Sequence, residues 1–210
     1  MLTANCVHFD NAVLETSPFR HFSTENFIDE DVASSLLRWF EQEADWNAKS
    51  IAGLGTLSSV DLHTSELGRD LDFLTGEPFL LHLRRKMGEL FATELEGFVD
   101  LTANCMTRRQ EIGAHNDIST LPPAFRFTHR LVLYLNRRYS EEYGGALALS
   151  NALSPSRPAP AQKRILPVHR SAFGFEISES SFHAIEPVLK GKRYSVTFSF
   201  YPGAGATNIV

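Results

Sequence analysis

The chain is poor in cysteine: only Cys6 and Cys105 occur among its 210 residues. Two cysteines do not make a disulfide framework, and this scarcity is typical of proteins that fold in a reducing cytosol. The sequence also lacks an apolar run long enough to span a bilayer, and residues 1–6 have neither the basic region nor the apolar region of a secretory signal peptide. These absences predict a soluble cytoplasmic protein without a membrane segment.

An excess of charge of one sign is missing as well. The 25 acidic side chains nearly balance the 20 basic ones, so the composition lacks the excess of positive charge that indicates binding to nucleic acid or to an anionic membrane surface. Tryptophan and tyrosine are scarce, with two and five residues, whereas 16 phenylalanines indicate an interior packed by phenylalanine. Because 43% of the residues are hydrophobic, the chain can bury one substantial core, and this predicts a single domain over residues 1–210.

Two segments in the first half have the apolar spacing of helices. Residues 23–46 are predicted to form the first helix, because acidic side chains lie near its start, where the helix dipole favours them, and apolar residues recur at helical spacing. Residues 78–95 are predicted to form the second helix, with a proline in its first turn and Gly97 behind its end. Residues 1–97 should therefore supply helical support and lead-in strands.

The remainder, residues 98–202, is predicted to form a mainly β core. The predicted strands are residues 101–106, 131–135, 146–149, 165–168, 172–177, 184–188 and 194–201. Many short strands with turns between them favour a sandwich or barrel, and the two helices should cover one of its outer faces. Residues 151–162, rich in proline and alanine, are predicted to form an irregular loop at the rim of a site. This loop and the glycine- and serine-rich residues 53–68 are the predicted mobile elements.

The first chemically informative pattern is His115-Asn116-Asp117. Side chains on a strand alternate between its two faces, so a strand here would direct His115 and Asp117 to the same side. Taken alone, the pattern favours an exposed or hydrogen-bonded surface pair. His183 changes this interpretation, because two imidazoles and one carboxylate can cap one face of an octahedral ion, as in the facial triad of non-haem Fe(II) oxygenases, and leave three positions open.

Arg193 follows His183 by ten residues and begins a strand-like run. The turn at residues 189–192 predicts a hairpin that brings the two side chains close together. The face of this strand that carries Arg193 is otherwise lined by Ser195, Thr197 and Ser199, and its other face is apolar. The polar row either lines a cavity or faces solvent above an apolar core. The histidine that precedes it at this spacing favours the cavity, in which Arg193 can hold the far end of a dicarboxylate.

Taken together, residues 115–201 resemble the 2-oxoglutarate and Fe(II)-dependent dioxygenase superfamily, in its prolyl-hydroxylase-like branch. The matching pieces are residues 115–117 (HND), 133–136 (LYLN), 143–149 (YGGALAL), 175–176 (FE), 183–188 (HAIEPV) and 193–197 (RYSVT). Residues 18–22 and 26–28 resemble the lead-in of the same branch. This resemblance covers most of the chain and implies a double-stranded β-helix core, the cupin-like jelly roll, with helical support.

The resemblance also implies a cofactor and its ligands. His115, Asp117 and His183 are implied to bind Fe(II), with 2-oxoglutarate as cosubstrate and O₂ as the oxidant. The enzyme would hydroxylate an unactivated C–H bond and release succinate and CO₂. In the related halogenases a small residue replaces the carboxylate and frees a position for halide. With Asp117 present, hydroxylation is expected, or a desaturation or cyclisation of the same substrate.

Further residues are implied to hold the cosubstrate. Arg193 is implied to pair with the distal carboxylate of 2-oxoglutarate, a task that suits the planar fork of a guanidinium. Tyr134 and Ser195 are implied to assist at the same carboxylate. For Tyr134 the alternative is a structural role as a tyrosine of the core.

The substrate is expected to be a small molecule, such as an amino acid or a related acid. If Tyr134 points inward, strand alternation places Arg130 in the cavity too, and a buried arginine needs an anionic partner. That partner is either a substrate carboxylate or an internal Asp or Glu. Ser199 is small where relatives can carry a bulky residue, which makes the pocket roomy.

Two other classes of function remain open at this point. One is a protein hydroxylase that acts on a prolyl or other side chain, which the family branch permits. The other is a non-catalytic cupin-like module that binds metal only. The compact chain favours a small-molecule substrate, and the complete set of metal ligands and arginine disfavours the module. No nucleic-acid or membrane partner is expected.

Overall fold

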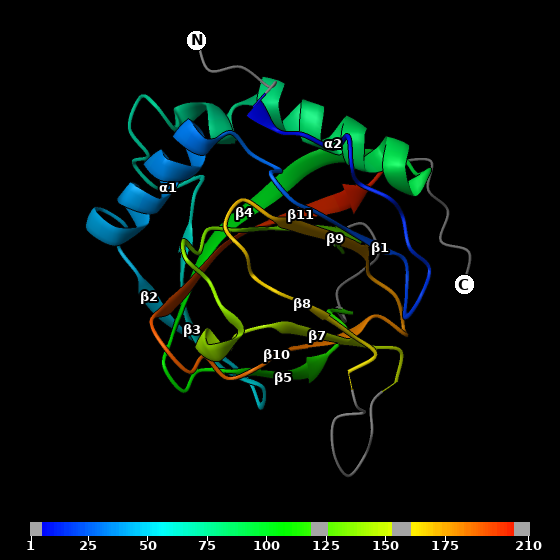
Figure 1. Ribbon diagram of the computed structural model, residues 1–210. Helices are drawn as coiled ribbons and strands as arrows, with labels where there is room; N and C mark the ends of the chain where they lie inside the picture. The colour runs from blue at the N-terminus through cyan, green and yellow to red at the C-terminus, as the bar shows by residue number, and fades with distance from the viewer. Residues whose placement is uncertain (1–5, 119–125, 153–160, 204–210) are drawn as a thin grey trace.

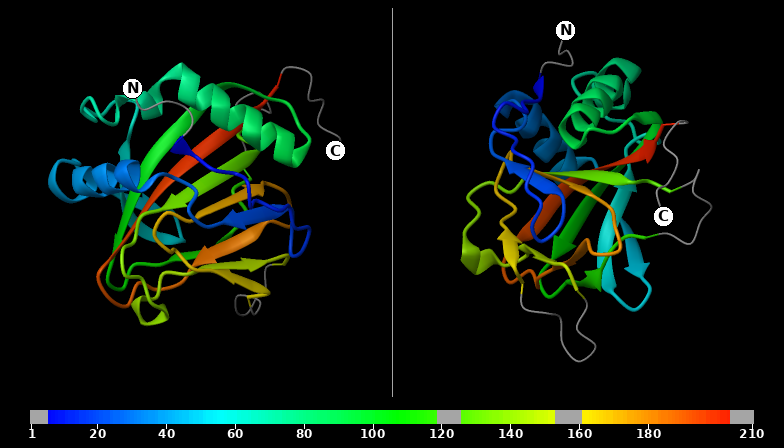
Figure 2. Two further views of the ribbon diagram at one scale, coloured as in Figure 1. Left: turned by 45° about the horizontal axis from the view of Figure 1, so that its top comes forward. Right: turned by 90° about the vertical axis from the view of Figure 1, so that its right-hand side faces the viewer.

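The strands form one sheet that bends into two walls (Figures 1 and 2). The computed structural model describes residues 6–118, 126–152 and 161–203. Its strands are β1 (His21–Thr24), β2 (Asn47–Ile51), β3 (Gly55–Asp61), β4 (Leu95–Thr107), β5 (Ile112–His115), β6 (His129–Tyr134), β7 (Leu147–Ser150), β8 (Lys163–Ile165), β9 (Ala172–Glu176), β10 (Phe182–Ile185) and β11 (Lys192–Pro202). The first wall has the order β1-β9-β6-β11-β4-β3-β2, and the second has the order β5-β10-β7-β8. The walls join where Gly55 of β3 pairs with Ile112 of β5, and this nearly closed arrangement confirms the predicted jelly-roll core.

The helices α1 (Glu30–Gln42) and α2 (Glu77–Phe91) cover the outer face of the first wall (Figure 1). Short 3₁₀ turns, η2 (Asp72–Thr75) and η4 (Glu141–Tyr143), lie before α2 and before β7. Leu36 of α1, Leu83 of α2 and Phe198 of β11 are buried in one core between the helices and the wall. The prediction that two helices cover one outer face is therefore confirmed. Over the described ranges, no helix combines the length and the apolar character that a membrane crossing requires.

Both predicted helices are too long. Instead of extending the first helix, residues 21–24 form β1 and pair with β9, and Asn26 then turns the chain with a left-handed φ of 50° before α1 begins. After α1, Asn47 starts β2. The second helix ends at Phe91, because Ala92 adopts the left-handed conformation (φ 52°), which ends a helix.

The predicted hairpin of residues 183–201 is wrong. β10 pairs with β5 and β7, whereas β11 pairs with β4 and β6, so the two strands belong to different walls. The connection between them is held across the gap by backbone hydrogen bonds, from Leu189 N to Tyr143 O (2.7 Å) and from Arg109 N to Val188 O (2.8 Å). His183 and Arg193 therefore reach the interior from opposite walls.

Two segments were predicted to be mobile. Within residues 53–68, β3 pairs with β2 on one side and with β4 on the other, so this part is sheet rather than loop. The sequence pattern predicted neither β2 nor β3. Residues 151–162 connect β7 to β8, as expected of a loop, but residues 153–160 lie outside the described ranges.

One buried histidine of the first wall should make the fold sensitive to acid. His129 of β6 is 4% exposed, packs its ring edge-on against Phe91 at 4.8 Å, and its Nε2 has no hydrogen-bond partner among the described residues. Burial lowers the pKa of His129 to about 4, whereas the unfolded chain protonates near 6.5. Between these values the unfolded state binds more protons, so stability falls as the pH falls.

We therefore expect wild type to lose about 2 kcal/mol of unfolding free energy through this residue between pH 7.5 and pH 5. Urea unfolding of wild type and His129→Gln at both pH values measures the effect. Between pH 7.5 and pH 5, His129→Gln should lose about 2 kcal/mol less unfolding free energy than wild type. Equal losses in both proteins would contradict the assignment.

Candidate functional site

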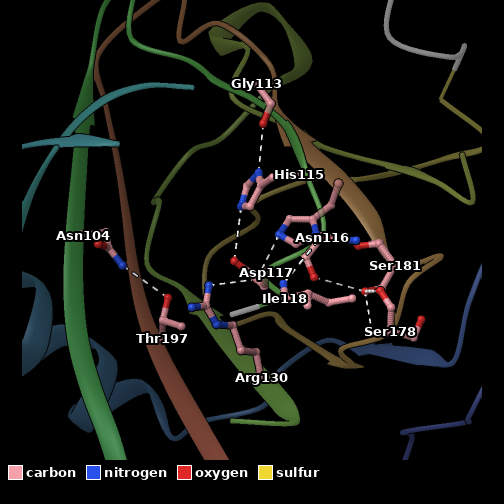
Figure 3. Close-up of polar contacts among 11 residues, drawn as sticks. Asn104, Gly113, His115, Asn116, Asp117, Ile118, Arg130, Ser178, Ser181 and Thr197 are labelled. Carbon is pink, nitrogen blue, oxygen red and sulfur yellow. Dashed lines mark hydrogen bonds and ion pairs between the residues drawn. The ribbon is translucent and has the colours of Figure 1, made fainter. Parts of the chain in front are cut away.

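Three potential metal ligands meet between the second wall and the turn that follows β5. Figure 3 labels two of them, His115 and Asp117. His115 ends β5, and His183 lies directly opposite it on β10. The carboxylate of Asp117 bridges the two rings, with Oδ1 3.3 Å from His115 Nε2 and Oδ2 3.3 Å from His183 Nε2. The candidate ligand atoms all lie within 4.8 Å of one another, which is the spacing of a site for a single ion.

The backbone places Asp117 differently from the prediction that it shares a strand with His115. β5 ends at His115, and Asp117 has a left-handed φ of 61°, so it does not continue the strand. Asn116 supports the turn by accepting the backbone N–H of Ile118 (3.3 Å) on its side chain. Strand pairing alone therefore places the histidines opposite each other, and a tight turn, not strand alternation, brings the aspartate to them.

Hydrogen bonds select the tautomer of both imidazoles. Nδ1 of His115 lies 2.9 Å from the carbonyl oxygen of Gly113, and Nδ1 of His183 lies 3.0 Å from that of Ser181. Because a carbonyl only accepts, each Nδ1 carries the proton of the neutral ring. In the neutral ring each Nε2 then keeps its lone pair, which is how neutral histidines bind a metal ion, whereas in a protonated ring Nε2 donates to Asp117 instead.

The charges around the cluster keep Asp117 ionised. Burial alone would raise the pKa of this carboxyl group, but the charge of Arg130 and the hydrogen bonds of the two histidines hold the pKa well below its ordinary value. Burial disfavours a charged His115 ring, yet the hydrogen bond and the charge of Asp117 raise its pKa. The cluster without metal is thus a carboxylate that attracts positive charge, and a divalent cation supplies that charge.

A buried cation lies on the opposite wall. Arg193 of β11 is 5% exposed, donates from Nε to the carbonyl of Gly145 (2.8 Å) and from Nη1 to Ser195 Oγ (3.4 Å), and forms no ion pair within the described residues. Its guanidinium lies 5.1 Å from the ring centre of Tyr134, whose buried hydroxyl also has no hydrogen-bond partner there. A buried arginine without an anion is costly, so this end of the interior is built for an anionic ligand.

A glycine leaves room for the arginine. Gly145 adopts a left-handed φ of 73°, and a Cβ at this position would come within 3.0 Å of Arg193 Cδ. A side chain there would both strain the backbone and displace the guanidinium.

A cavity of about 330 Å³ joins the two features. The polar row of β11 faces it, so Ser195, Thr197 and Ser199 line the cavity as the cavity interpretation predicted. The apolar row of the same strand packs under the helices. Both faces of β11 are therefore buried, which reconciles the two orientations considered from the sequence.

Comparison with known proteins identifies the chemistry of this arrangement. Residues 101–201, which include all three candidate metal ligands and Arg193, match the model of the 2OG-Fe(II) oxygenase superfamily. These residues belong to that superfamily. The enzyme is accordingly a 2-oxoglutarate-dependent oxygenase that uses Fe(II) and O₂. No functionally curated protein matches the sequence significantly.

Solved structures share the fold of this oxygenase. A prolyl-4-hydroxylase from Pseudomonas putida is 16% identical over 88% of this chain and 93% of its own, with a TM-score of 0.69. A prolyl hydroxylase from Trichoplax adhaerens, in complex with a peptide fragment of the hypoxia inducible factor oxygen degradation domain, is 16% identical over 86% and 83%, with a TM-score of 0.66. A 2OG-Fe(II) oxygenase family oxidoreductase from Burkholderia pseudomallei is 15% identical over 90% and 88%, with a TM-score of 0.61.

The residues of the oxygenase fit the two groups that the superfamily uses. Two neutral imidazole nitrogens and one carboxylate form the donor set that suits Fe(II) in this class. Arg193 without an ion pair and the Tyr134 hydroxyl without a hydrogen-bond partner, both judged over the described residues, suit the distal carboxylate of 2-oxoglutarate. Each feature is unfavourable or incomplete without a ligand, and each is completed by one of these groups.

Arg130 lies in the cavity, as strand alternation with Tyr134 predicted, but it is not free. Its Nη1 forms an ion pair with Asp117 Oδ2 at 2.9 Å, and its guanidinium lies 4.5 Å from the ring centre of Phe127. Of the two partners that the sequence left open for Arg130, the structure shows an internal acid, and this acid is Asp117, a candidate iron ligand. Its Nε is buried and has no hydrogen-bond partner among the described residues, so one donor remains for a ligand.

Sequence reasoning missed part of the cavity. Thr102 and Asn104 of β4 line it, and Asn104 Nδ2 donates to Thr197 Oγ1 at 3.2 Å (Figure 3). The alternation of polar and apolar residues along 99–106 was the available signal. Lys49 and Ile51 of β2 also line the cavity, and no sequence pattern connects that strand with the site.

Proposed function

We propose that the enzyme hydroxylates an unactivated C–H bond of a small molecule that carries a carboxylate, such as an amino acid or a related acid. The observation that carries this proposal is the second arginine in the cavity. The two charges of 2-oxoglutarate balance those of Fe(II), and Asp117 balances one arginine. The other arginine and the exposed Lys49, which also lines the cavity, leave an excess of positive charge. The buried Nε of Arg130 has no hydrogen-bond partner in the part of the chain that the structure describes, so an anionic substrate group completes the cavity.

Residue roles follow from this assignment. His115 and His183 would hold iron through Nε2, and Asp117 through its carboxylate. When bound, iron and 2-oxoglutarate together supply an oxidation that consumes O₂, releases succinate and CO₂ and places one oxygen atom on the substrate. The protein contributes ligand orientation and a shielded cavity. The carboxylate of Asp117 favours hydroxylation over halogenation, because no ligand position is left free by a small residue.

The cosubstrate residues form a second group. Arg193 would bind the distal carboxylate of 2-oxoglutarate through its guanidinium, and Tyr134 and Ser195 would add hydroxyl groups to the same site. Ser199 lies farther along β11, opposite Arg130 of β6, and would leave space for the substrate.

A protein hydroxylase is the second candidate function. It is supported by the fold shared with prolyl hydroxylases, one of them solved with a peptide fragment. The cavity of about 330 Å³ favours the small molecule, because it must hold both 2-oxoglutarate and the reacting group.

An anaerobic titration distinguishes the two candidates. Addition of 2-oxoglutarate to the Fe(II) protein should produce a visible charge-transfer band, and small carboxylic acids should shift it. Peptides without a free terminal carboxylate near the reacting residue should not. A shift caused only by such peptides would favour the protein hydroxylase, and the absence of any band would remove the assignment of these residues.

Replacement of Arg130 tests the substrate contact. We expect Arg130→Leu to raise KM for an acidic substrate about 10- to 100-fold, because a hydrogen-bonded charge pair is lost. The KM of Arg130→Lys should lie between those of wild type and Arg130→Leu, since lysine keeps the charge but lacks the planar, two-pronged donor geometry of a guanidinium. Arg164→Leu, which removes a surface arginine paired with Glu186, is the matched control. An unchanged KM in Arg130→Leu would contradict the role of Arg130.

A further inference from the structure

Three neighbouring strands of the first wall place an acid, a serine and a base in one row. In the register of β4, β11 and β6, Asp100 lies opposite Ser199, and Ser199 lies opposite Arg130. The neighbours Val99 and Leu101 are buried beneath the helices, whereas Asp100 is half-buried on the face that carries Thr102. This row lies at the end of the polar face of β11 that is farther from Arg193.

Aromatic side chains connect the acid and the base. Tyr201 donates its hydroxyl to Asp100 Oδ2 at 2.8 Å, and its ring meets Phe127 edge-on at 6.2 Å. Phe127 in turn lies under the guanidinium of Arg130. Within the described residues Asp100 forms no ion pair, so its charge is balanced by no cation of the protein there.

The order of the row suits a molecule with two opposite charges. Asp100 and Arg130 lie on the two strands that flank β11, and neighbouring strands are about 4.8 Å apart. Ser199 lies between them, and its small side chain leaves space for a ligand that contacts both. A free amino acid carries an ammonium and a carboxylate group on neighbouring carbon atoms, so it offers one charge to each side of the row.

We propose that Asp100 and Arg130 form a zwitterion subsite that binds the ammonium and carboxylate groups of a free amino acid. The inference rests on the proposed function, because it names the class of the small-molecule acid. Arg130 binds the carboxylate with the donors that Asp117 does not use, and Asp100, oriented by Tyr201, accepts from the ammonium group. A residue inside a peptide chain has neither charge, so this subsite selects free amino acids.

The test uses the anaerobic complex of the full chain with Fe(II) and 2-oxoglutarate. The probes are the standard L-amino acids, each with its N-acetyl and its carboxamide derivative, and the readouts are the shift of the visible band and the dissociation constant derived from it. Thermal unfolding of the same samples gives a readout independent of the band. At least one free amino acid should bind, and both derivatives of it should bind at least about 10-fold more weakly.

Asp100→Asn keeps an acceptor for Tyr201 and removes the charge. It should raise the dissociation constant of the free amino acid at least about 10-fold and leave that of the N-acetyl derivative unchanged. Asp70→Asn, which removes an exposed charge outside the cavity, should bind as wild type does. A normal 2-oxoglutarate band with no response to any free amino acid, or equal binding of the free and N-acetylated forms, would overturn the subsite but not the proposed function. Failure to form the band at all would overturn both.

Discussion

Asp117→Ala should abolish substrate-coupled release of succinate and lower the affinity for Fe(II) by at least about 100-fold. Loss of residues that only orient metal ligands already costs about 10- to 100-fold in metal affinity or activity, and removal of a ligand should cost at least as much. The carboxylate is also the sole negative charge among the three ligands and lies within 3.3 Å of both Nε2 atoms. Without it, two neutral rings face Arg130, whose positive charge repels a cation.

Equilibrium dialysis with Fe(II) under anaerobic conditions measures the affinity, and succinate release measures turnover. Asp117→Asn keeps the shape of the side chain and should also lose most of the affinity, because the charge rather than the volume attracts the metal. Asp70→Ala is the control for loss of an exposed acid. Retention of Fe(II) affinity by Asp117→Ala, with an intact fold by circular dichroism, would show that the metal lies elsewhere.

The sequence predicts the strands of the jelly roll better than the path between them. The two rows of β11 predicted that its polar row lines the cavity, because strand alternation is a local property, but they did not predict that the apolar row is buried as well. The hairpin of His183 and Arg193 failed, because a short turn between two strands does not reveal whether they pair with each other. Here backbone hydrogen bonds from Leu189 to Tyr143 and from Arg109 to Val188 hold the connection between the two walls. The partners in these bonds lie far apart in the sequence, so the local pattern does not reveal them.

The site shows the same division between residue identity and arrangement. The residue types of the metal cluster and of Arg193 were evident from the motif order, and the structure brings His115, Asp117 and His183 within reach of one ion. The left-handed turn at Asp117 was not predicted, because a non-glycine residue rarely adopts this conformation without support from its surroundings. The pairing of Arg130 with Asp117 joins residues from different walls, which periodicity along one strand cannot show.

Arg193→Leu should raise the dissociation constant for 2-oxoglutarate at least about 100-fold while the affinity for Fe(II) stays unchanged. Truncation of a buried, hydrogen-bonded charge partner costs about 2–5 kcal/mol, and Arg193 is buried with no ion-pair partner in the part of the chain that the structure describes. Burial also lowers the pKa of Arg193, which shows that its charge is held against a desolvation cost that an anion relieves. The lost interaction is therefore one with the cosubstrate.

Two measurements separate this effect from loss of the metal site. Asp117→Ala should lose both Fe(II) binding and the visible band, whereas Arg193→Leu should bind Fe(II) normally and form the band only at much higher 2-oxoglutarate. Tyr134→Phe removes only a hydroxyl and should weaken 2-oxoglutarate less, by up to about 10-fold. If Arg193→Leu bound 2-oxoglutarate as tightly as wild type, the buried guanidinium would serve another anion. The distal carboxylate would then be held by another cation of the cavity, Arg130 or Lys49.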